Sequence, residues 1–164
     1  GNPLPSAFAM ERASGFTPEF CGFPIGAMLA SEKYAKVLSP GTHASTFGGT
    51  PLACAAACAV IDTFDREHIL ENVQARSAYL MEKLSALSSK YPCVKGIRGL
   101  GLMIGVVMDR PAGPVLAILR EKGMIALSAG ETVLRLVPPL TVTQTDCEKA
   151  VALIDEAFER LSAN

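Results

Sequence analysis

Residues 43–56 contain the feature that most restricts how this chain can fold: two hydroxyl residues and two glycines directly before an alanine-rich segment. Thr50 and Pro51 begin that segment and are typical of the N-cap and the first position of an α-helix. Gly48 and Gly49 allow a tight turn in which backbone N–H groups approach an anion closely. The pattern predicts either a capped turn before a buried helix or an anion-binding loop at the start of that helix.

The size and charge of the chain narrow the class of protein. Its 164 residues suffice for one domain, or for one domain and a small second one. Hydrophobic residues make up 49% and the mean hydropathy is +0.31, which indicates a large buried fraction or an extensive subunit interface. The net charge is -1 and basic residues form no long run, so we expect no nucleic-acid partner.

The apolar and cysteine patterns indicate an intracellular, membrane-free setting. The longest apolar run, residues 52–61, is too short to span a bilayer, and residues 1–20 show no signal-peptide pattern. We therefore expect a cytoplasmic protein with no membrane contact. The cysteines are odd in number and include no CxxC pair: Cys21, Cys54, Cys58, Cys93 and Cys147. We expect buried thiols rather than disulfides or metal ligands.

The periodicity of apolar residues predicts mixed helices and strands. Helices are expected over residues 50–65, 68–91 and 113–122, and from 143 onward. Short apolar runs predict strands over residues 22–31, 102–108, 124–127 and 133–136. Thr143 and Asp146 form a capping-box pattern at the start of the last helix. The order of these elements indicates an α/β protein: an α+β C-terminal lobe joined by a long helix to part of a larger domain.

Four segments occur in an order that is typical of one enzyme family. They are Gly-Phe-Pro-Ile-Gly-Ala-Met-Leu at 22–29, Ser-Thr-Phe-Gly-Gly-Thr-Pro-Leu-Ala at 45–53, Arg-Gly-Leu-Gly-Leu-Met-Ile-Gly at 98–105 and Leu-Arg-Leu-Val-Pro-Pro-Leu at 134–140. Together they resemble the class III aminotransferases, which are fold-type I enzymes that use pyridoxal phosphate. The resemblance implies that residues 1–66 are the last part of the large cofactor-binding domain. Residues 67–92 would form a linking helix, and residues 93–164 would form the small C-terminal α/β domain.

Thr46 is the first candidate site residue. A hydroxyl beside the glycine pair can donate a charge-assisted hydrogen bond to a phosphate oxygen. In the resembled family the matching threonine binds the cofactor phosphate of the neighbouring subunit, which implies a homodimer with shared active sites. Ser45 would support Thr46 in cofactor binding, and a plain turn hydroxyl is the alternative role for Ser45.

Arg135 is the second candidate, because it interrupts the apolar pattern of residues 133–137. An unpaired buried guanidinium is costly, and its planar fork suits a carboxylate. The resemblance implies that Arg135 binds the α-carboxylate of the substrate; the alternative is an edge-strand arginine whose head reaches water. For Arg98, which precedes a strand in a glycine-rich segment, we expect a structural hydrogen-bonding role rather than a second carboxylate clamp.

The cofactor-binding lysine is the main departure from the family pattern. The family places the lysine that forms a Schiff base with the cofactor just before the 22–29 motif, but residues 17–21 read Thr-Pro-Glu-Phe-Cys. We therefore expect a short lysine-bearing segment to be absent between Phe20 and Cys21, and residues 1–20 match the family poorly. No catalytic residue and no metal site are predicted in this chain, which we expect to be inactive alone.

The resemblance implies transamination of N-acetylornithine, or of ornithine or succinylornithine, with 2-oxoglutarate in arginine biosynthesis. The implied partners are pyridoxal phosphate, a small amino acid, 2-oxoglutarate and a second copy of the chain. Two alternatives remain: another class III enzyme, or a non-catalytic dimerisation or regulatory remnant of the fold. The Ser-Thr-Phe-Gly-Gly sequence at residues 45–49 argues against glutamate-1-semialdehyde aminomutase.

Overall fold

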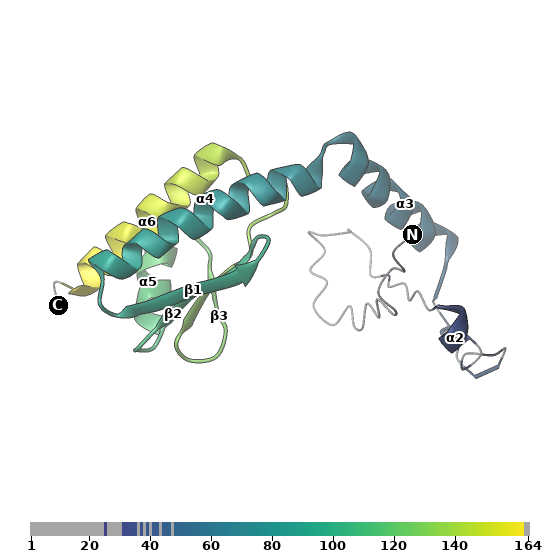
Figure 1. The fold of residues 1–164 in the computed structure, drawn as a ribbon, viewed down its shortest axis with the longest axis horizontal. Helices are drawn as coiled ribbons and strands as arrows, with labels where there is room; N and C mark the ends of the chain where they lie inside the picture. Colours follow the sequence, from purple (N-terminus) through teal and green to yellow (C-terminus); the bar gives the residue numbers. More distant parts are fainter. Residues whose placement is uncertain are drawn as a thin grey trace. The chain divides into compact units, whose positions relative to one another are not determined.

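The computed structural model describes residue 25 and residues 31–35, 37, 39, 41–42, 44–46 and 48–162. The lysine-bearing gap expected between Phe20 and Cys21, and nearly all of the strand expected at 22–31, lie outside these residues. The chain divides into two compact units, with the boundary between Glu67 and His68. Figure 1 labels the helices and strands of both units.

The first unit contains α2 (Glu32–Ala35) and α3 (Pro51–Arg66). The helix expected over 50–65 is confirmed, with Thr50 in extended conformation at the N-cap and Pro51 at the first position. The N–H of Cys54 donates to the carbonyl of Thr50 at 2.9 Å. The Thr50 side chain makes no capping hydrogen bond, so the polar groups at the start of α3 are left for other partners.

The second unit is built on an antiparallel sheet. Its strands β1 (Val94–Leu100), β2 (Met103–Met108), β3 (Leu127–Ser128) and β4 (Val133–Leu136) lie in the order β1-β2-β4-β3. The strands expected at 102–108 and 133–136 are confirmed. The strand expected at 124–127 is wrong except at its last residue, because Met124 still bonds back to the end of the preceding helix, to the carbonyl of Leu119 at 2.9 Å.

The sequence pattern does not predict strand β1. Two glycines and two cations interrupt its apolar pattern, which therefore does not alternate as a half-buried strand does. Its bonds to β2 hold it in place, with Arg98 opposite Gly105 and Leu100 opposite Met103.

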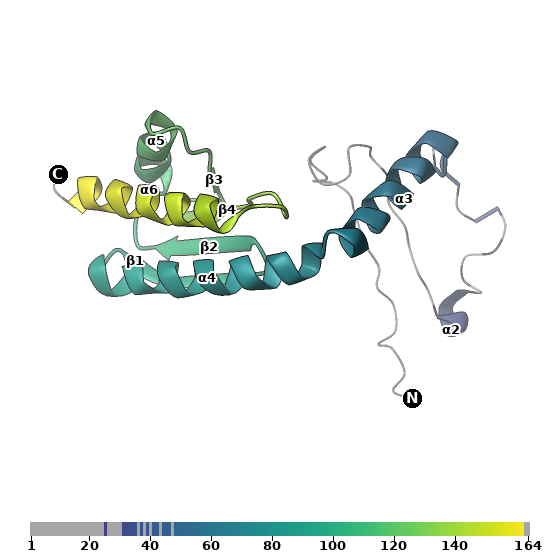
Figure 2. The ribbon, with the colours of Figure 1, turned by 90° about the horizontal axis from the view of Figure 1, so that it is seen from above.

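Three helices complete the second unit: α4 (Ile69–Lys90), α5 (Gly113–Glu121) and α6 (Gln144–Ser162). Helices α4 and α6 run side by side along the sheet (Figures 1 and 2). All three helices that were expected in this region are confirmed. Their apolar faces share one core with alternate residues of β2 and β4, which are Ile104, Val106, Leu134 and Leu136.

The start of α6 confirms the predicted capping box. Thr143 Oγ1 lies 2.6 Å from Asp146 Oδ2, and the Asp146 N–H donates back to Thr143 Oγ1 at 3.2 Å. The hydrogen bonds that the hydroxyl and the backbone N–H of Thr143 donate to Asp146 Oδ2 lower the pKa of the Asp146 carboxyl group. They supply partners for polar groups that an uncapped helix leaves unsatisfied.

The cysteines differ from expectation in part. Cys93 and Cys147 are buried thiols, as expected, and burial raises the pKa of Cys147. Cys54 and Cys58 are exposed, so the expected burial is wrong for these two, because α3 leaves most of its side chains uncovered within its own unit. Cys21 lies outside the described residues. The four described cysteines are free thiols.

None of the helices in the described part of the chain has the length and apolar character needed to cross a membrane. Across the same part of the chain, no three His, Cys, Asp or Glu side chains gather as ligands for a metal ion.

Candidate functional site

Ser45 and Thr46 lie together in the turn that leads to α3. The Gly48 N–H donates to the carbonyl of Ser45 at 3.3 Å, so the chain turns back between these residues. Gly49 has a φ of +67°, a conformation that favours glycine. Both Ser45 and Thr46 are exposed. Their hydroxyl groups make no hydrogen bond to the described residues.

The start of α3 has the character of an anion site. The first N–H groups of a helix lack partners within the helix and carry a partial positive charge. No acidic residue stands in the first turn of α3, and Thr50 does not cap it. Two free hydroxyls, a glycine turn and an uncapped helix start form a donor set that fits a phosphate group.

Arg135 lies on β4, where it pairs with Gly105 of β2 and with Leu127 of β3. Its neighbours Leu134 and Leu136 point into the core, so Arg135 projects from the opposite face of the sheet. Strand β4 lies between β2 and β3, which contradicts the alternative that Arg135 stands on an edge strand.

Among the residues that the structure describes, the Arg135 guanidinium has no hydrogen-bond or ion-pair partner. Its Nε atom is buried and makes no hydrogen bond, and Arg135 forms no ion pair with the described residues. A buried donor without a partner is unfavourable by about 1–3 kcal/mol. The site therefore offers a guanidinium group that would gain from an external carboxylate.

Arg98 of β1 pairs with Gly105 of β2, and Gly105 pairs with Arg135 of β4 on its other side. Its side chain is exposed. It makes no hydrogen bond to the described residues, so the structural hydrogen-bonding role expected for Arg98 finds no support there. The sequence could not reveal this neighbour of Arg135, because the two arginines are brought together only by the pairing of β1, β2 and β4.

Two α4 side chains that no sequence motif marks bind the segment after β4. Asn72 Nδ2 donates to the carbonyl of Leu140 at 2.8 Å and to that of Val142 at 3.1 Å. One turn further along, Arg76 donates to Gln144 Oε1. No sequence signal links residues so far apart in the chain. The contacts fasten the Val-Pro-Pro-Leu segment, which leaves the strand that carries Arg135.

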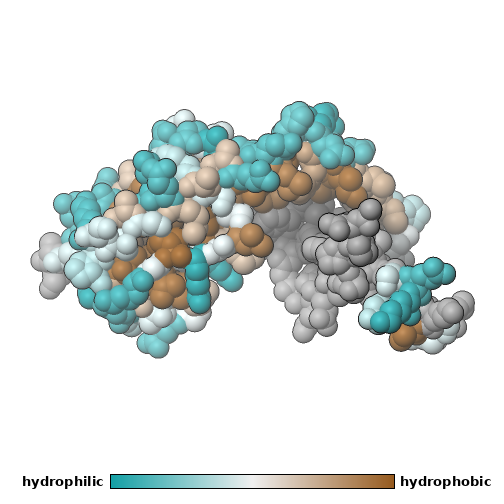
Figure 3. Space-filling model, in the orientation of Figure 1, coloured by the Kyte–Doolittle hydropathy of each residue, from teal (hydrophilic) through white to brown (hydrophobic). Residues whose placement is uncertain are grey.

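The structure thus brings Ser45 and Thr46 together in the first unit and places Arg135 in the second. The open sheet face around Arg135 is apolar at its margin, where Leu100 is 90% and Met103 is 61% exposed. Figure 3 shows apolar side chains gathered over the strands of this unit. An arginine with an unsatisfied donor beside an apolar surface suits a ligand that is anionic at one end and aliphatic elsewhere.

Known proteins are similar to this chain in sequence and in fold. The class III aminotransferase family matches residues 20–158. The acetylornithine aminotransferase of Gloeobacter violaceus is 42% identical over 159 residues, which is 96% of this chain and 38% of that protein. The acetylornithine aminotransferase of Lactococcus lactis is 45% identical over 137 residues, covering 82% of this chain and 36% of that protein.

Solved structures agree with these relatives. The ornithine aminotransferase of Toxoplasma gondii matches 83% of this chain and 33% of that chain, with a TM-score of 0.78 and 31% identity. The acetylornithine aminotransferase of Elizabethkingia anophelis matches 81% of this chain and 36% of that chain, with a TM-score of 0.74 and 28% identity. The chain therefore spans less than two-fifths of the length of these similar proteins.

Proposed function

The chain belongs to the class III aminotransferases, a family that depends on pyridoxal phosphate, and we therefore propose that it forms the C-terminal part of an enzyme that transfers an amino group between N-acetylornithine and 2-oxoglutarate. The acetylornithine aminotransferases at 42% and 45% identity support this donor. Ornithine and succinylornithine are the competing donors. The reaction would serve arginine biosynthesis.

Within this enzyme, residues 1–66 would be the last part of the large cofactor-binding domain. Residues 93–164 would form the small domain, and residues 67–92 would link the two. The unit boundary between Glu67 and His68 supports a division at the start of α4. No lysine precedes residue 33, so on this proposal the chain alone is inactive and supplies binding groups rather than the lysine.

The observation that carries the proposal is the unpartnered guanidinium of Arg135. Its Nε is buried without a hydrogen bond on an inner strand. A substrate α-carboxylate would satisfy this donor and would neutralise the charge through a bidentate pair. Amino donor and oxo-acid acceptor both carry an α-carboxylate, so one arginine can orient both substrates in turn.

The loop before α3 would hold the cofactor phosphate. Thr46 and Ser45 would donate hydroxyl hydrogen bonds, and the N–H groups at the start of α3 would complete the phosphate site. When bound, pyridoxal phosphate supplies the electron sink that amino-group transfer needs. We further propose a homodimer in which Thr46 of one subunit serves the cofactor of the other.

Replacing Arg135 by lysine in the complete enzyme tests the substrate-binding role. Lysine keeps the charge but loses the planar fork, so we expect KM for both N-acetylornithine and 2-oxoglutarate to rise by roughly tenfold or more. Both half-reaction rates should fall together, while cofactor retention and the melting temperature stay near normal.

Arg120→Lys is the matched control, because Arg120 is an exposed arginine at the end of α5, away from the sheet face. This control should leave both KM values unchanged. If Arg135→Lys lowers the melting temperature but leaves both half-reactions intact, Arg135 is a structural residue and its proposed role is wrong.

A further inference from the structure

The N-terminal half of α4 binds two connections of the sheet through polar side chains. Asn72 Nδ2 donates hydrogen bonds to the carbonyl of Leu140 at 2.8 Å and to that of Val142 at 3.1 Å. Ser77 Oγ donates to the carbonyl of Gly101, in the turn between β1 and β2, at 2.8 Å. This part of the helix thus fixes both the turn after β1 and the segment after β4.

Both connections lie at the same end of the sheet. Strand β1 ends at Leu100 opposite Met103 of β2, and β4 ends at Leu136 opposite Ile104. Arg135 is the residue before Leu136, so it lies one position from this end of the sheet. The position of the Arg135 backbone therefore depends on how firmly the end of β4 is held.

The segment after β4 cannot hold this end by extending the sheet. Pro138 and Pro139 lack the N–H group that a strand donates to its neighbour. The Val142 N–H closes a turn onto the carbonyl of Pro139 at 2.9 Å. The carbonyls of Leu140 and Val142 are bonded by the Asn72 side chain instead. A partly buried carbonyl without a partner is unfavourable, so Asn72 stabilises this course of the chain.

The Asn72 side chain suits this task because a primary amide carries two N–H donors. It binds two carbonyls that lie two residues apart in one segment. Asn72 stands on α4, whose apolar residues share the core with Ile104 and Leu136, whereas Arg135 projects from the opposite face of the sheet. Any effect of Asn72 on a ligand of Arg135 must therefore pass through the backbone of the segment after β4.

We propose that Asn72 is a positioning residue for Arg135. By binding the carbonyls of Leu140 and Val142, it holds the end of β4 and keeps the Arg135 guanidinium where a substrate carboxylate binds. The inference rests on the substrate role proposed for Arg135 and adds a residue that does not touch the substrate. A displaced guanidinium would weaken the binding of ground state and transition state alike, so the loss should fall on KM.

The test is Asn72→Leu in the complete enzyme, because leucine keeps the size of the side chain and removes both donors. We expect KM for N-acetylornithine and for 2-oxoglutarate to rise by about threefold to tenfold, with kcat changed by less than about twofold. In the Arg135→Lys background the same substitution should raise KM no further, since its effect passes through the arginine fork. Asn72→Ala, which leaves room for water at the two carbonyls, takes its place if Asn72→Leu does not fold.

Tyr91→Phe is the matched control. The Tyr91 hydroxyl also joins α4 to a distant element, because it donates to Asp155 Oδ1 of α6 at 2.6 Å, but it does so at the other end of the helix. This control should lower the melting temperature and leave both KM values unchanged.

The outcomes separate this inference from the function on which it rests. If Arg135→Lys raises both KM values but Asn72→Leu behaves like Tyr91→Phe, the positioning role is wrong and the substrate role of Arg135 stands. An equal rise in KM with and without Arg135→Lys would also contradict the positioning role, because Asn72 would then act independently of Arg135. If Arg135→Lys leaves both KM values unchanged, the substrate role of Arg135 fails, and the positioning role fails with it.

Discussion

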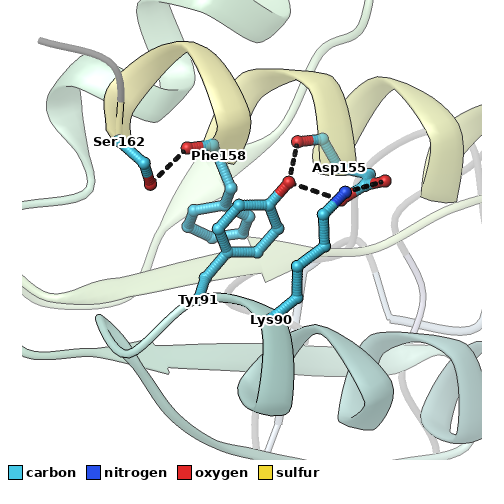
Figure 4. A network of polar contacts seen from close by, with 5 residues as sticks. All are labelled: Lys90, Tyr91, Asp155, Phe158 and Ser162. Atoms are coloured by element: carbon cyan, nitrogen blue, oxygen red, sulfur yellow. Dashed lines mark hydrogen bonds and ion pairs between the residues drawn. The ribbon is translucent and has the colours of Figure 1, made fainter.

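At the scale of single residues, Lys90, Tyr91 and Asp155 join the end of α4 to α6 (Figure 4). The Tyr91 hydroxyl donates to Asp155 Oδ1 at 2.6 Å, and Lys90 Nζ lies 2.8 Å from the same oxygen. Tyr91 is only 4% exposed, and its ring packs on Phe158 with ring centres 5.5 Å apart. These contacts with Lys90 and then Tyr91 lower the pKa of Asp155, and burial raises the pKa of Tyr91.

Tyr91→Phe keeps the ring packing and removes the hydroxyl, so it should reduce the free energy of unfolding by about 1 kcal/mol at pH 7. Because the pKa of Asp155 is lowered in the folded protein, the stabilisation by its ionised form is complete above the unfolded pKa of about 3.9 and is lost as pH falls through the folded pKa. The difference between the variant and the original should shrink below about pH 4. Urea unfolding at several pH values measures it.

Tyr79→Phe is the control for this change, because Tyr79 is a half-buried tyrosine of the same helix whose hydroxyl has no hydrogen bond to the described residues. Equal losses for Tyr79→Phe and Tyr91→Phe, or a Tyr91 effect that persists unchanged at pH 3, would count against the network.

At the scale of elements, the β1–β2 hairpin depends on a close approach of backbone to backbone. Leu100 pairs with Met103 across a two-residue connection, in which Gly101 has a φ of +55°. Ser77 of α4 donates a hydrogen bond to the carbonyl of Gly101 at 2.8 Å. A Cβ atom on Gly99 would lie 2.3 Å from the Met103 carbonyl oxygen, so this position has no room for a side chain.

Gly99→Ala should therefore destabilise the second unit by about 1–3 kcal/mol, the range for overpacking a tight site. Gly96→Ala is the matched change in the same strand, where a Cβ atom would meet nothing within 4 Å, and it should leave stability nearly unchanged. Thermal unfolding of both variants gives the comparison. Similar melting temperatures for the two would show that the hairpin relaxes around an added methyl group.

The capping box of α6 makes a second prediction at this scale. Thr143→Ala removes the hydroxyl that bonds to Asp146, and we expect a loss of about 1 kcal/mol in unfolding free energy. The pKa of Asp146 should rise toward its ordinary value, because the Thr143 hydrogen bonds are the main cause that lowers it. An NMR titration of Asp146 and a urea curve test both parts.

Thr141→Ala serves as control for the cap, since Thr141 is exposed and lies before the helix. It should alter neither the pKa of Asp146 nor the stability. An unchanged Asp146 pKa in Thr143→Ala would mean that groups other than the cap set the titration of this carboxyl.

At the scale of the whole molecule, the described chain consists of two units with unequal cores. The second unit buries one continuous cluster between its sheet and helices. In the first unit, α3 buries only Ala53 among its described residues. A segment with so little buried apolar surface gains little stability from its own packing. The proposed homodimer, and the additional length present in relatives such as the Gloeobacter violaceus enzyme, would provide surfaces to cover it.

The shared site proposed for that dimer can be tested with mixed subunits. In the complete enzyme, Thr46→Val should weaken cofactor retention by about 1–3 kcal/mol, because one hydroxyl donor to the phosphate is lost. In a mixed dimer, one subunit carries Thr46→Val and its partner lacks the Schiff-base lysine. One of the two sites should then be intact, and the other should carry both defects. Unchanged cofactor affinity in the single variant would remove Thr46 from the site. A mixed dimer in which one site lacks only the Thr46 hydroxyl and the other lacks only the lysine would contradict sharing between subunits.

Much of the secondary structure could be predicted from the sequence, because the signals are local. The helices of the second unit repeat apolar residues at helical spacing, and Thr143 and Asp146 mark the start of α6 within three positions. The hydroxyl and glycine residues around Thr46 likewise predict a turn before α3 from a few neighbouring residues, and the binding of an anion there stays a prediction. The four motifs identified the family for the same reason, since each is a short continuous stretch.

Only the tertiary structure decided what depends on residues far apart in the chain. The glycines of β1 hid the strand, and its pairing with β2 gave Arg98 a place beside Arg135. Exposure of Cys54 and Cys58 could not be read from composition, since burial depends on which neighbours cover a helix. Asn72 holds the segment after β4 only because the fold brings it to the carbonyls of Leu140 and Val142, which are far from it in the sequence. Local propensity acts over a few residues, whereas strand pairing and side-chain burial are set by contacts between distant segments.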